Sequence, residues 1–217
     1  MPSKGNAVAK SETLYFAYGS NFSFKQMGAR CPQSKYVGIG RLHKYKWQIN
    51  NRGYANIIPG GPADVVYGLC YLLSTADEAT LDKKEGVRLR AYDKHYLNVE
   101  FFKADKRLLG YKTTELAKGS LGSNRAIESG DQGENRPKTL VYISAIHIED
   151  GAPKSEYVQR MATGITDALR LGVPRQYIDR SLRPALGLSN PPSSASKGSA
   201  VKTYNESQCI PVANGGK

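Results

Sequence analysis

The turn that follows residues 14–17 (LYFA) holds the first residues whose types suit a chemical role. An apolar run typical of a buried strand gives way there to Gly19, Ser20 and Asn21. Glycine can adopt backbone angles closed to other residues, and short side chains leave nearby peptide N–H groups uncovered. Such N–H groups can bind a carboxylate or an oxyanion, and a helix beginning at Ser23 would add its own. The alternative is an ordinary turn, because these residue types are common in turns.

Glu85 is the second candidate, because it lies where the pattern predicts the end of a helix. Residues 74–87 (STADEATLDKKEGV) predict a short helix in which Thr75 and Glu78 have capping-box spacing and Gly86 marks the stop. A carboxylate at a helix C-terminus faces the negative end of the helix dipole, which raises its pKa and suits it to acid–base work. The two lysines before Glu85 favour the opposite interpretation, a solvated charge run.

Cysteine and histidine residues show no metal-binding pattern. Cys31, Cys70 and Cys209 form no CxxC pair, and the three histidines lie far apart. An odd number of cysteines leaves at least one thiol unpaired, and we expect all three to be reduced. The sequence therefore predicts no metal site.

The length and composition suit one globular domain. Apolar residues make up 40% of the 217 residues, enough for a sizeable core, and no apolar run reaches the roughly 20 residues that span a bilayer. The start of the sequence lacks the apolar segment of a secretory signal, so we expect a cytoplasmic protein without a membrane partner. A net charge of +12 attracts polyanions, but the basic residues are spread along the chain and predict no specific nucleic-acid site.

Many strands and few helices predict an α+β fold with a largely antiparallel sheet that curls toward a barrel. The alternating or apolar segments expected to be strands, the first three as a meander, are residues 44–50, 54–58, 65–73, 95–103 and 139–148. Beyond the early helix, a helical pattern begins at Ser155 and ends near Gly172, and a second helix is expected from Pro174 to about Leu186.

The expected domain covers residues 12–187. Residues 1–11 are polar and read as a disordered lead, and residues 188–217 read as a low-complexity tail. Within the domain, residues 117–136 are rich in Gly, Ser, Asn and Asp and predict a long mobile loop.

The order and spacing of several short motifs resemble the γ-glutamylcyclotransferase family from about residue 14 to residue 186. The motifs are YFAYGSN, then EGV with Tyr92 seven residues beyond Glu85, and Tyr157 at the start of a late helix. The resemblance implies a small, mainly antiparallel β-barrel with flanking helices, in which the glycine turn and Glu85 face each other across a cavity. It implies no cofactor, and a homodimer is an open alternative to a monomer.

The activity that the resemblance implies is the release of 5-oxoproline from a γ-glutamyl amino acid or peptide. The α-amine of the substrate attacks its own γ-carbonyl, so no enzyme nucleophile is needed. Glu85 would take the proton of the amine and pass it to the departing amine, while the N–H groups of residues 18–22 bind the oxyanion. The expected substrate-binding residues are Tyr15, Phe16, Ala17, Tyr18, Gly19, Ser20, Asn21, Phe22, Tyr92 and Tyr157.

Several points stay open in this comparison. Tyr92 and Tyr157 would close the pocket and donate hydrogen bonds, although each could be a core aromatic residue, and Trp47 and Asn56 are weaker candidates for the cavity wall. Phe22 stands where relatives often carry leucine. The loop of residues 117–136 looks longer than usual and either covers the pocket or extends into solvent.

Three other functions compete with this interpretation. One is the same chemistry on a glutathione-derived adduct, as the resemblance implies for fungal relatives in sulfur-containing secondary metabolism. Another is a non-catalytic ligand-binding member of the fold, although the presence of both Glu85 and the glycine turn argues against it. The last is a nucleic-acid binder, which only the net charge favours.

Overall fold

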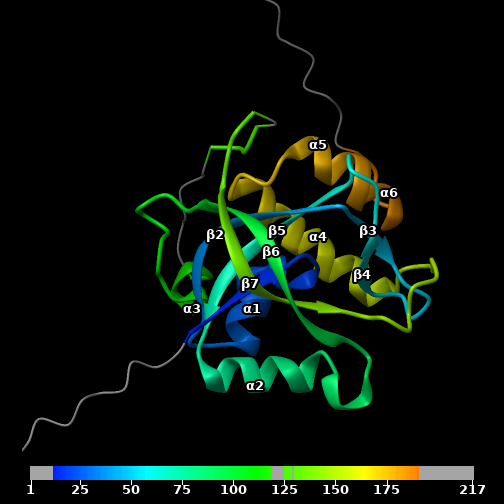
Figure 1. Cartoon of the computed structure of the whole chain (residues 1–217), viewed down its shortest axis with the longest axis horizontal. Helices are drawn as coiled ribbons and strands as arrows, with labels where there is room; N and C mark the ends of the chain where they lie inside the picture. Colours follow the sequence, from blue (N-terminus) through cyan, green and yellow to red (C-terminus); the bar gives the residue numbers. More distant parts are fainter. Residues whose placement is uncertain (1–11, 119–124, 129, 191–217) are drawn as a thin grey trace, which may run out of the picture.

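Five strands form a closed barrel at the centre of the protein (Figure 1). The computed structural model describes residues 12–118, 125–128 and 130–190. The barrel strands are β1 (Thr13–Ala17), β2 (Lys35–His43), β5 (Val65–Leu73), β6 (Asp93–Lys103) and β7 (Glu134–Ile143). They neighbour one another in the order β1-β5-β2-β6-β7, and β7 closes the barrel by pairing with β1 in parallel. All other barrel pairs are antiparallel, which confirms the expected barrel class.

The expected three-stranded meander is wrong. β3 (Tyr45–Ile49) and β4 (Ala55–Pro59) pair only with each other, in a separate two-stranded sheet. β5 instead lies between β1 and β2 in the barrel, so the chain leaves the barrel after β2 and returns to it at β5. β2 was not expected from the sequence, although it pairs with both β5 and β6.

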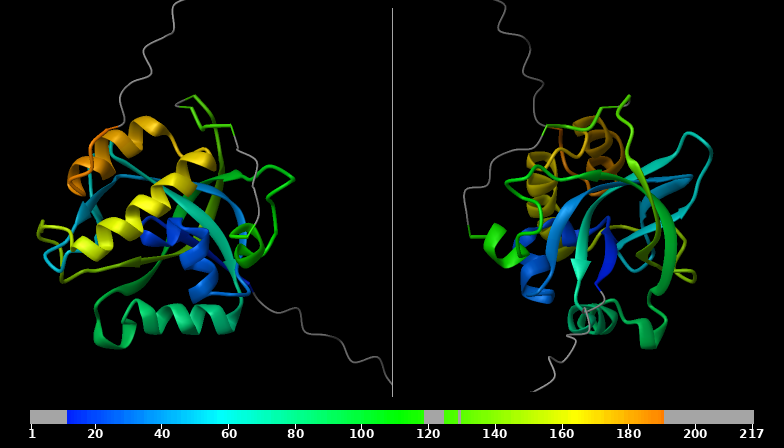
Figure 2. Two further views of the ribbon diagram at one scale, coloured as in Figure 1. Left: turned by 180° about the vertical axis from the view of Figure 1, so that it is seen from behind. Right: turned by 60° about the vertical axis from the view of Figure 1, so that its left-hand side comes forward.

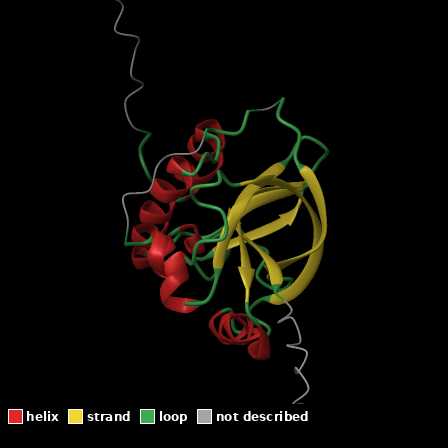
Figure 3. Cartoon of the chain, turned by 90° about the vertical axis from the view of Figure 1, so that its left-hand side faces the viewer, coloured by secondary structure: helices red, strands yellow, loops and turns green. Residues whose placement is uncertain are grey.

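Most of the helices lie on one side of the barrel, and α2 crosses one of its ends (Figure 3). The longer helices are α1 (Phe24–Arg30), α2 (Thr75–Lys84) and α4 (Ser155–Arg170). The shorter ones are α3 (Thr113–Leu116), α5 (Arg175–Tyr177), α6 (Arg183–Ala185), and the single turns η1 (Ser20–Phe22), η2 (Val87–Leu89) and η3 (Ile178–Leu182). The expected second late helix is confirmed as one continuous helical segment, in which a π-turn at η3 lies between α5 and α6.

In the left view of Figure 2, helices α4 and α1 lie next to each other in front of the barrel. The backbone N–H of Phe24, at the start of α1, donates to the Asp167 carboxylate of α4 at 3.1 Å. Five residues of α4 are buried, namely Tyr157, Met161, Gly164, Ile165 and Ala168, so the helix packs along one apolar face. This packing fixes Tyr157 next to the turn that follows β1.

The expected loop and tails are only partly described. β7 begins at Glu134, so the last residues of the expected 117–136 loop belong to a strand. Residues 119–124 and 129 lie outside the described residues, as do the expected lead (1–11) and residues 191–217 of the expected tail. Among the helices of the described part, none is long and apolar enough to cross a membrane.

Candidate active site

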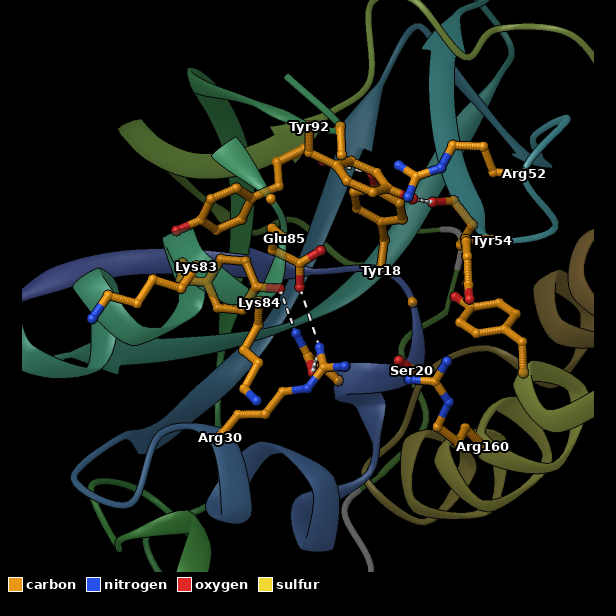
Figure 4. Close-up of a pocket in the computed structure, with 18 of the residues that line it drawn as sticks. Tyr18, Ser20, Arg30, Arg52, Tyr54, Lys83, Lys84, Glu85, Tyr92 and Arg160 are labelled. Atoms are coloured by element: carbon orange, nitrogen blue, oxygen red, sulfur yellow. Dashed lines mark hydrogen bonds and ion pairs between the residues drawn. The ribbon is translucent and has the colours of Figure 1, made fainter. Parts of the chain in front are cut away.

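A cavity of about 410 Å³ separates the glycine turn after β1 from the end of α2 (Figure 4). Of the expected site residues it brings together Glu85, Tyr15, Tyr18, Gly19, Ser20, Asn21, Tyr92 and Tyr157. The expected residues Phe16, Ala17 and Phe22 do not line it, because each is buried in the core. The described residues of the 117–136 segment do not line it either.

Gly19 is required for a different reason from the one expected. Its φ of −121° lies outside the left-handed region that favours glycine, so a positive φ does not explain it. A Cβ at this position would lie 3.0 Å from the Tyr157 hydroxyl and 3.4 Å from Cβ of Ala55. The glycine therefore allows Tyr157 to approach the turn closely.

The turn offers fewer free N–H groups than expected. The Phe22 N–H donates to the Gly19 carbonyl at 2.9 Å, and the Ser23 N–H donates to the Ser20 carbonyl at 3.2 Å. At the start of α1, the Ser23 side chain accepts from the Gln26 N–H and Asp167 accepts from the Phe24 N–H. The remaining N–H groups of the turn are those of residues 19–21, and that of Ser20 is directed at the Tyr157 hydroxyl.

Asn21 holds the turn in place through both ends of its side chain. Its Nδ2 donates to the Tyr15 hydroxyl at 3.0 Å, and its Oδ1 accepts from Gln26 Nε2 and from Arg30 Nη1, each at 3.1 Å. Its carbonyl accepts from the Tyr71 hydroxyl at 2.9 Å. An asparagine at this position thus links β1, α1 and β5 through one residue.

Glu85 enters the cavity from the end of α2. The helix is capped by Ser74, whose hydroxyl accepts from the Asp77 N–H at 3.2 Å, so the expected capping box at Thr75 is wrong by one residue. Gly86 has a φ of +69°, a left-handed conformation that ends the helix directly after Glu85. The expected stop is confirmed, and it leaves Glu85 as the last residue before the chain turns away.

Burial raises the pKa of the Glu85 carboxyl above its ordinary value. Arg30, Asn21 and Arg160 act in the opposite direction but do not cancel the effect of burial. Arg30 Nη1 lies 3.2 Å from Glu85 Oε1. The expected direction of the shift is confirmed, although its largest cause is burial rather than the helix dipole.

The tyrosines of the cavity are held by backbone groups. The Tyr92 hydroxyl donates to the Ala55 carbonyl at 2.7 Å, and the Tyr18 hydroxyl donates to the Tyr142 carbonyl at 2.6 Å. Burial raises the pKa of Tyr92, Tyr18 and Tyr157, so each phenol keeps its proton. The Tyr92 hydroxyl already donates its hydrogen bond to a backbone carbonyl, so it can offer a ligand only its oxygen lone pairs.

Trp47 and Asn56 do not line the cavity but support its walls. Trp47 Nε1 donates to the Tyr18 carbonyl at 2.9 Å, next to the glycine turn. Asn56 donates to the carbonyls of Ser144 and His147, which joins β4 to the segment after β7.

The site therefore combines one carboxylic acid of raised pKa, a glycine turn and several phenols. Comparison with known proteins finds that residues 15–131, more than half of the chain, match the family described as gamma-glutamyl cyclotransferase, AIG2-like. The chain belongs to this family.

Curated relatives in the γ-glutamylcyclotransferase family share about a third of the aligned residues. The mouse γ-glutamylcyclotransferase is 31% identical over 100 residues, which cover 41% of this chain and 53% of the mouse protein. The bovine protein of the same name is 32% identical over 89 residues, which cover 36% of this chain and 47% of the bovine protein. The aligned part of the chain thus spans about half the length of the curated relatives it matches.

Solved structures agree on the fold. A structure of gamma-glutamyl cyclotransferase superposes with a TM-score of 0.58 at 19% identity, over 85% of this chain and 92% of the other. The crystal structure of an uncharacterized human protein gives a TM-score of 0.56 at 21% identity, over 86% and 92%. At these identities the likeness shows a shared barrel with flanking helices.

The cavity also contains basic residues that the sequence analysis did not identify as site residues. They are Arg30 at the end of α1, Arg52 between β3 and β4, and Arg160 on α4, together with Lys83 and Lys84 before Glu85. Arg160 lies three residues after Tyr157, a spacing that puts both on one helix face and could have identified it. Arg52 lies in a turn with no local signal.

Proposed function

We propose that the protein is a γ-glutamylcyclotransferase that converts γ-glutamyl compounds to 5-oxoproline and a free amine. The observation that carries the proposal is the position of Glu85, a carboxyl of raised pKa that shares one cavity with the glycine turn. A proton carrier and a set of backbone donors are the two elements that this cyclisation requires.

The first step is deprotonation of the substrate. The α-amine of a γ-glutamyl group is an ammonium at neutral pH and cannot attack until it loses a proton. An ionised Glu85 accepts that proton, and the raised pKa of its carboxyl brings it closer to the pKa of the amine. The amine is tethered three carbons from the γ-carbonyl, so a five-membered ring forms with a large gain in effective concentration.

The second step is collapse of the tetrahedral intermediate. Its oxyanion would accept hydrogen bonds from the N–H groups of residues 19–21, and Glu85 would return the proton to the departing nitrogen. One C–N bond forms and the amide C–N bond breaks, and the amine leaves with the two protons that the α-ammonium lost. The balance requires no metal, nucleotide or water.

The test measures 5-oxoproline directly. Purified protein incubated with γ-glutamyl-alanine should release 5-oxoproline and alanine in equal amounts, and Glu85→Gln should lower kcat by at least about a hundredfold. Glutathione and a bulky glutathione S-conjugate, assayed alongside, would establish which γ-glutamyl compounds are accepted. A Glu85→Gln variant with most of the wild-type rate would contradict the acid–base role.

A further inference from the structure

The cavity carries a large excess of positive charge around Glu85. Arg30 and Lys84 lie on one side of this carboxylate, whereas Arg52 and Arg160 come from the opposite wall (Figure 4). Among the described residues that line the cavity, Glu85 is the only acid. A single carboxylate does not require cations on both sides, so the second group points to an anionic part of the ligand.

Arg30 is already committed to the protein. One of its nitrogens donates to Asn21 Oδ1 at 3.1 Å and lies 3.2 Å from Glu85 Oε1, and its side chain is 21% exposed. It is therefore placed to support the turn and the carboxylate, next to the part of a substrate that reacts.

Arg52 and Arg160 are not committed in this way. Arg52 is exposed and has no carboxylate partner among the described residues, and its guanidinium carbon lies 5.9 Å from the centre of the Tyr54 ring. Arg160 lies 6.0 Å from the same ring and pairs with Glu156 at 2.9 Å, a pair on the helix surface whose acid is 56% exposed. A second nitrogen of Arg160 donates to the other oxygen of Glu156 at 3.1 Å, but Glu156 is exposed enough for water to solvate its carboxylate when Arg160 binds a ligand instead.

The two guanidinium groups lie near one aromatic ring of the cavity wall, that of Tyr54. Both arginines lie near its ring, and the Tyr54 ring packs edge-on against Tyr157 with centroids 5.3 Å apart. Planar guanidinium groups bind carboxylates through paired N–H donors, which ammonium groups do not match. Two such groups from different elements, fixed by one aromatic ring, form a suitable carboxylate site.

A γ-glutamyl amino acid has one carboxylate on each side of its scissile amide. The glutamyl portion is constant and must place its amine at Glu85, whereas the departing portion varies and must extend toward solvent. We propose that Arg52 and Arg160 bind the carboxylate of the departing amine, so that the enzyme prefers γ-glutamyl amino acids, and acidic ones most, over γ-glutamyl derivatives of neutral amines. This inference rests on the proposed function and adds the class of amine released.

Two matched substrate pairs test the inference. γ-Glutamyl-alanine and γ-glutamyl-alaninamide have nearly the same size and differ in one carboxylate, and γ-glutamyl-glutamate and γ-glutamyl-glutamine differ likewise. The wild-type kcat/KM should favour the acid of each pair by about tenfold or more, as expected for a charge-assisted hydrogen bond. Arg52→Gln and Arg160→Gln should each reduce that preference to about threefold or less. Because Arg160 also lowers the pKa of Glu85, the effect of Arg160→Gln is measured as the ratio of kcat/KM within each pair and not as the rate on either substrate.

The control is Arg107→Gln, which removes one positive charge from a side chain that is 72% exposed and does not line the cavity. It should keep the wild-type preference. A wild-type preference near one would overturn the subsite, as would an Arg52→Gln variant that loses equally on both members of a pair, because the arginine would then bind the glutamyl portion.

Calorimetry separates this inference from the proposed function. If no substrate yields 5-oxoproline, the proposed function fails, but the Kd values of γ-glutamyl-alanine and γ-glutamyl-alaninamide can still be compared. Tighter binding of the acid, lost in Arg52→Gln and partly restored in Arg52→Lys, would support the subsite without turnover. Equal Kd values would overturn it.

Discussion

The Arg30 guanidinium lies 3.2 Å from the Glu85 carboxylate, and this ion pair joins the end of α1 to the end of α2. The same guanidinium donates to Asn21 in the glycine turn at 3.1 Å. Arg30 thus holds the proposed proton carrier and the proposed oxyanion-binding turn in one fixed arrangement. Burial and this cation oppose each other in setting the pKa of Glu85.

Arg30→Gln should shift the pH dependence of the reaction to higher pH. Removal of the cation eliminates a charge that lowers the pKa of Glu85, so burial acts with less opposition and the pKa rises further. Glu85 must be ionised to accept a proton, so the acidic limb of kcat/KM against pH should move upward. The measurement is 5-oxoproline release from about pH 5 to pH 9.

Arg30→Lys serves as the control for charge. It retains the cation but loses the geometry with which the guanidinium contacts both Asn21 and Glu85. The acidic limb of the pH profile should therefore stay nearer to its wild-type position while kcat falls. If the glutamine and lysine variants had the same pH profile as the wild type and differed only in rate, Arg30 would have no electrostatic role at Glu85.

Glu85→Gln should stabilise the fold at neutral pH while it removes activity. The folded-state pKa of Glu85 is raised, so the folded protein holds this proton more tightly than the unfolded chain does. The contribution of Glu85 to stability is therefore complete below the ordinary pKa of 4.5 and is lost as the pH rises through the folded-state value. Glutamine does not ionise and avoids this loss.

Thermal melts at two pH values check this sign. At pH 4 the wild type and Glu85→Gln should have similar Tm values, whereas at pH 8 the variant should have the higher Tm. If the Tm of the variant fell below that of the wild type at pH 8 but not at pH 4, the ionised carboxylate would be stabilising, in conflict with the raised pKa.

The barrel could be predicted from the sequence more easily than its strand order. β5 and β6 have long apolar or alternating segments, and the segments expected for them overlap the observed strands closely. β2 was missed because Gly38 and Gly40 weaken its strand pattern, and glycine carries no apolar side chain to count. The meander failed because pairing depends on contacts distant in sequence, which no local pattern encodes.

The residues of the candidate site also differ in whether a local sequence pattern predicts them. Glu85 and the glycine turn have local signals, namely a helix stop and a break in a strand. Arg52 and Arg160 come from segments more than 100 residues apart and meet only at the Tyr54 ring, so the fold alone brings them together. The expected substrate-binding residues after β1 begins also included one that does not belong to the site, because Phe16 points into the barrel and not into the cavity.

Gly68→Ala should destabilise the barrel. Gly40 and Gly68 face each other in the pairing of β2 with β5, and the Phe16 ring packs against both. A Cβ at Gly68 would lie 2.5 Å from the Ala17 carbonyl and 2.5 Å from the Phe16 ring, too close for either to accommodate. We expect the free energy of unfolding to fall by about 1–3 kcal/mol.

The control for this prediction is Gly61→Ala. A Cβ there meets no atom nearer than 3.6 Å, and the change should alter the free energy of unfolding by less than about 1 kcal/mol. Urea denaturation of both variants measures the difference. Equal midpoints would contradict the close packing of Phe16 between the paired glycines.

Gly19→Ala should lower activity through the Tyr157 hydroxyl and not through backbone strain. The new Cβ would lie 3.0 Å from that hydroxyl, and the φ of −121° is accessible to alanine, so the turn itself need not change. Tyr157→Phe removes the oxygen that the methyl group meets. In a double-mutant cycle on kcat/KM, the loss in Gly19→Ala should therefore be smaller when Tyr157→Phe is already present, with a coupling of about 1 kcal/mol. Purely additive losses would mean that the methyl group acts by covering the N–H groups of the turn.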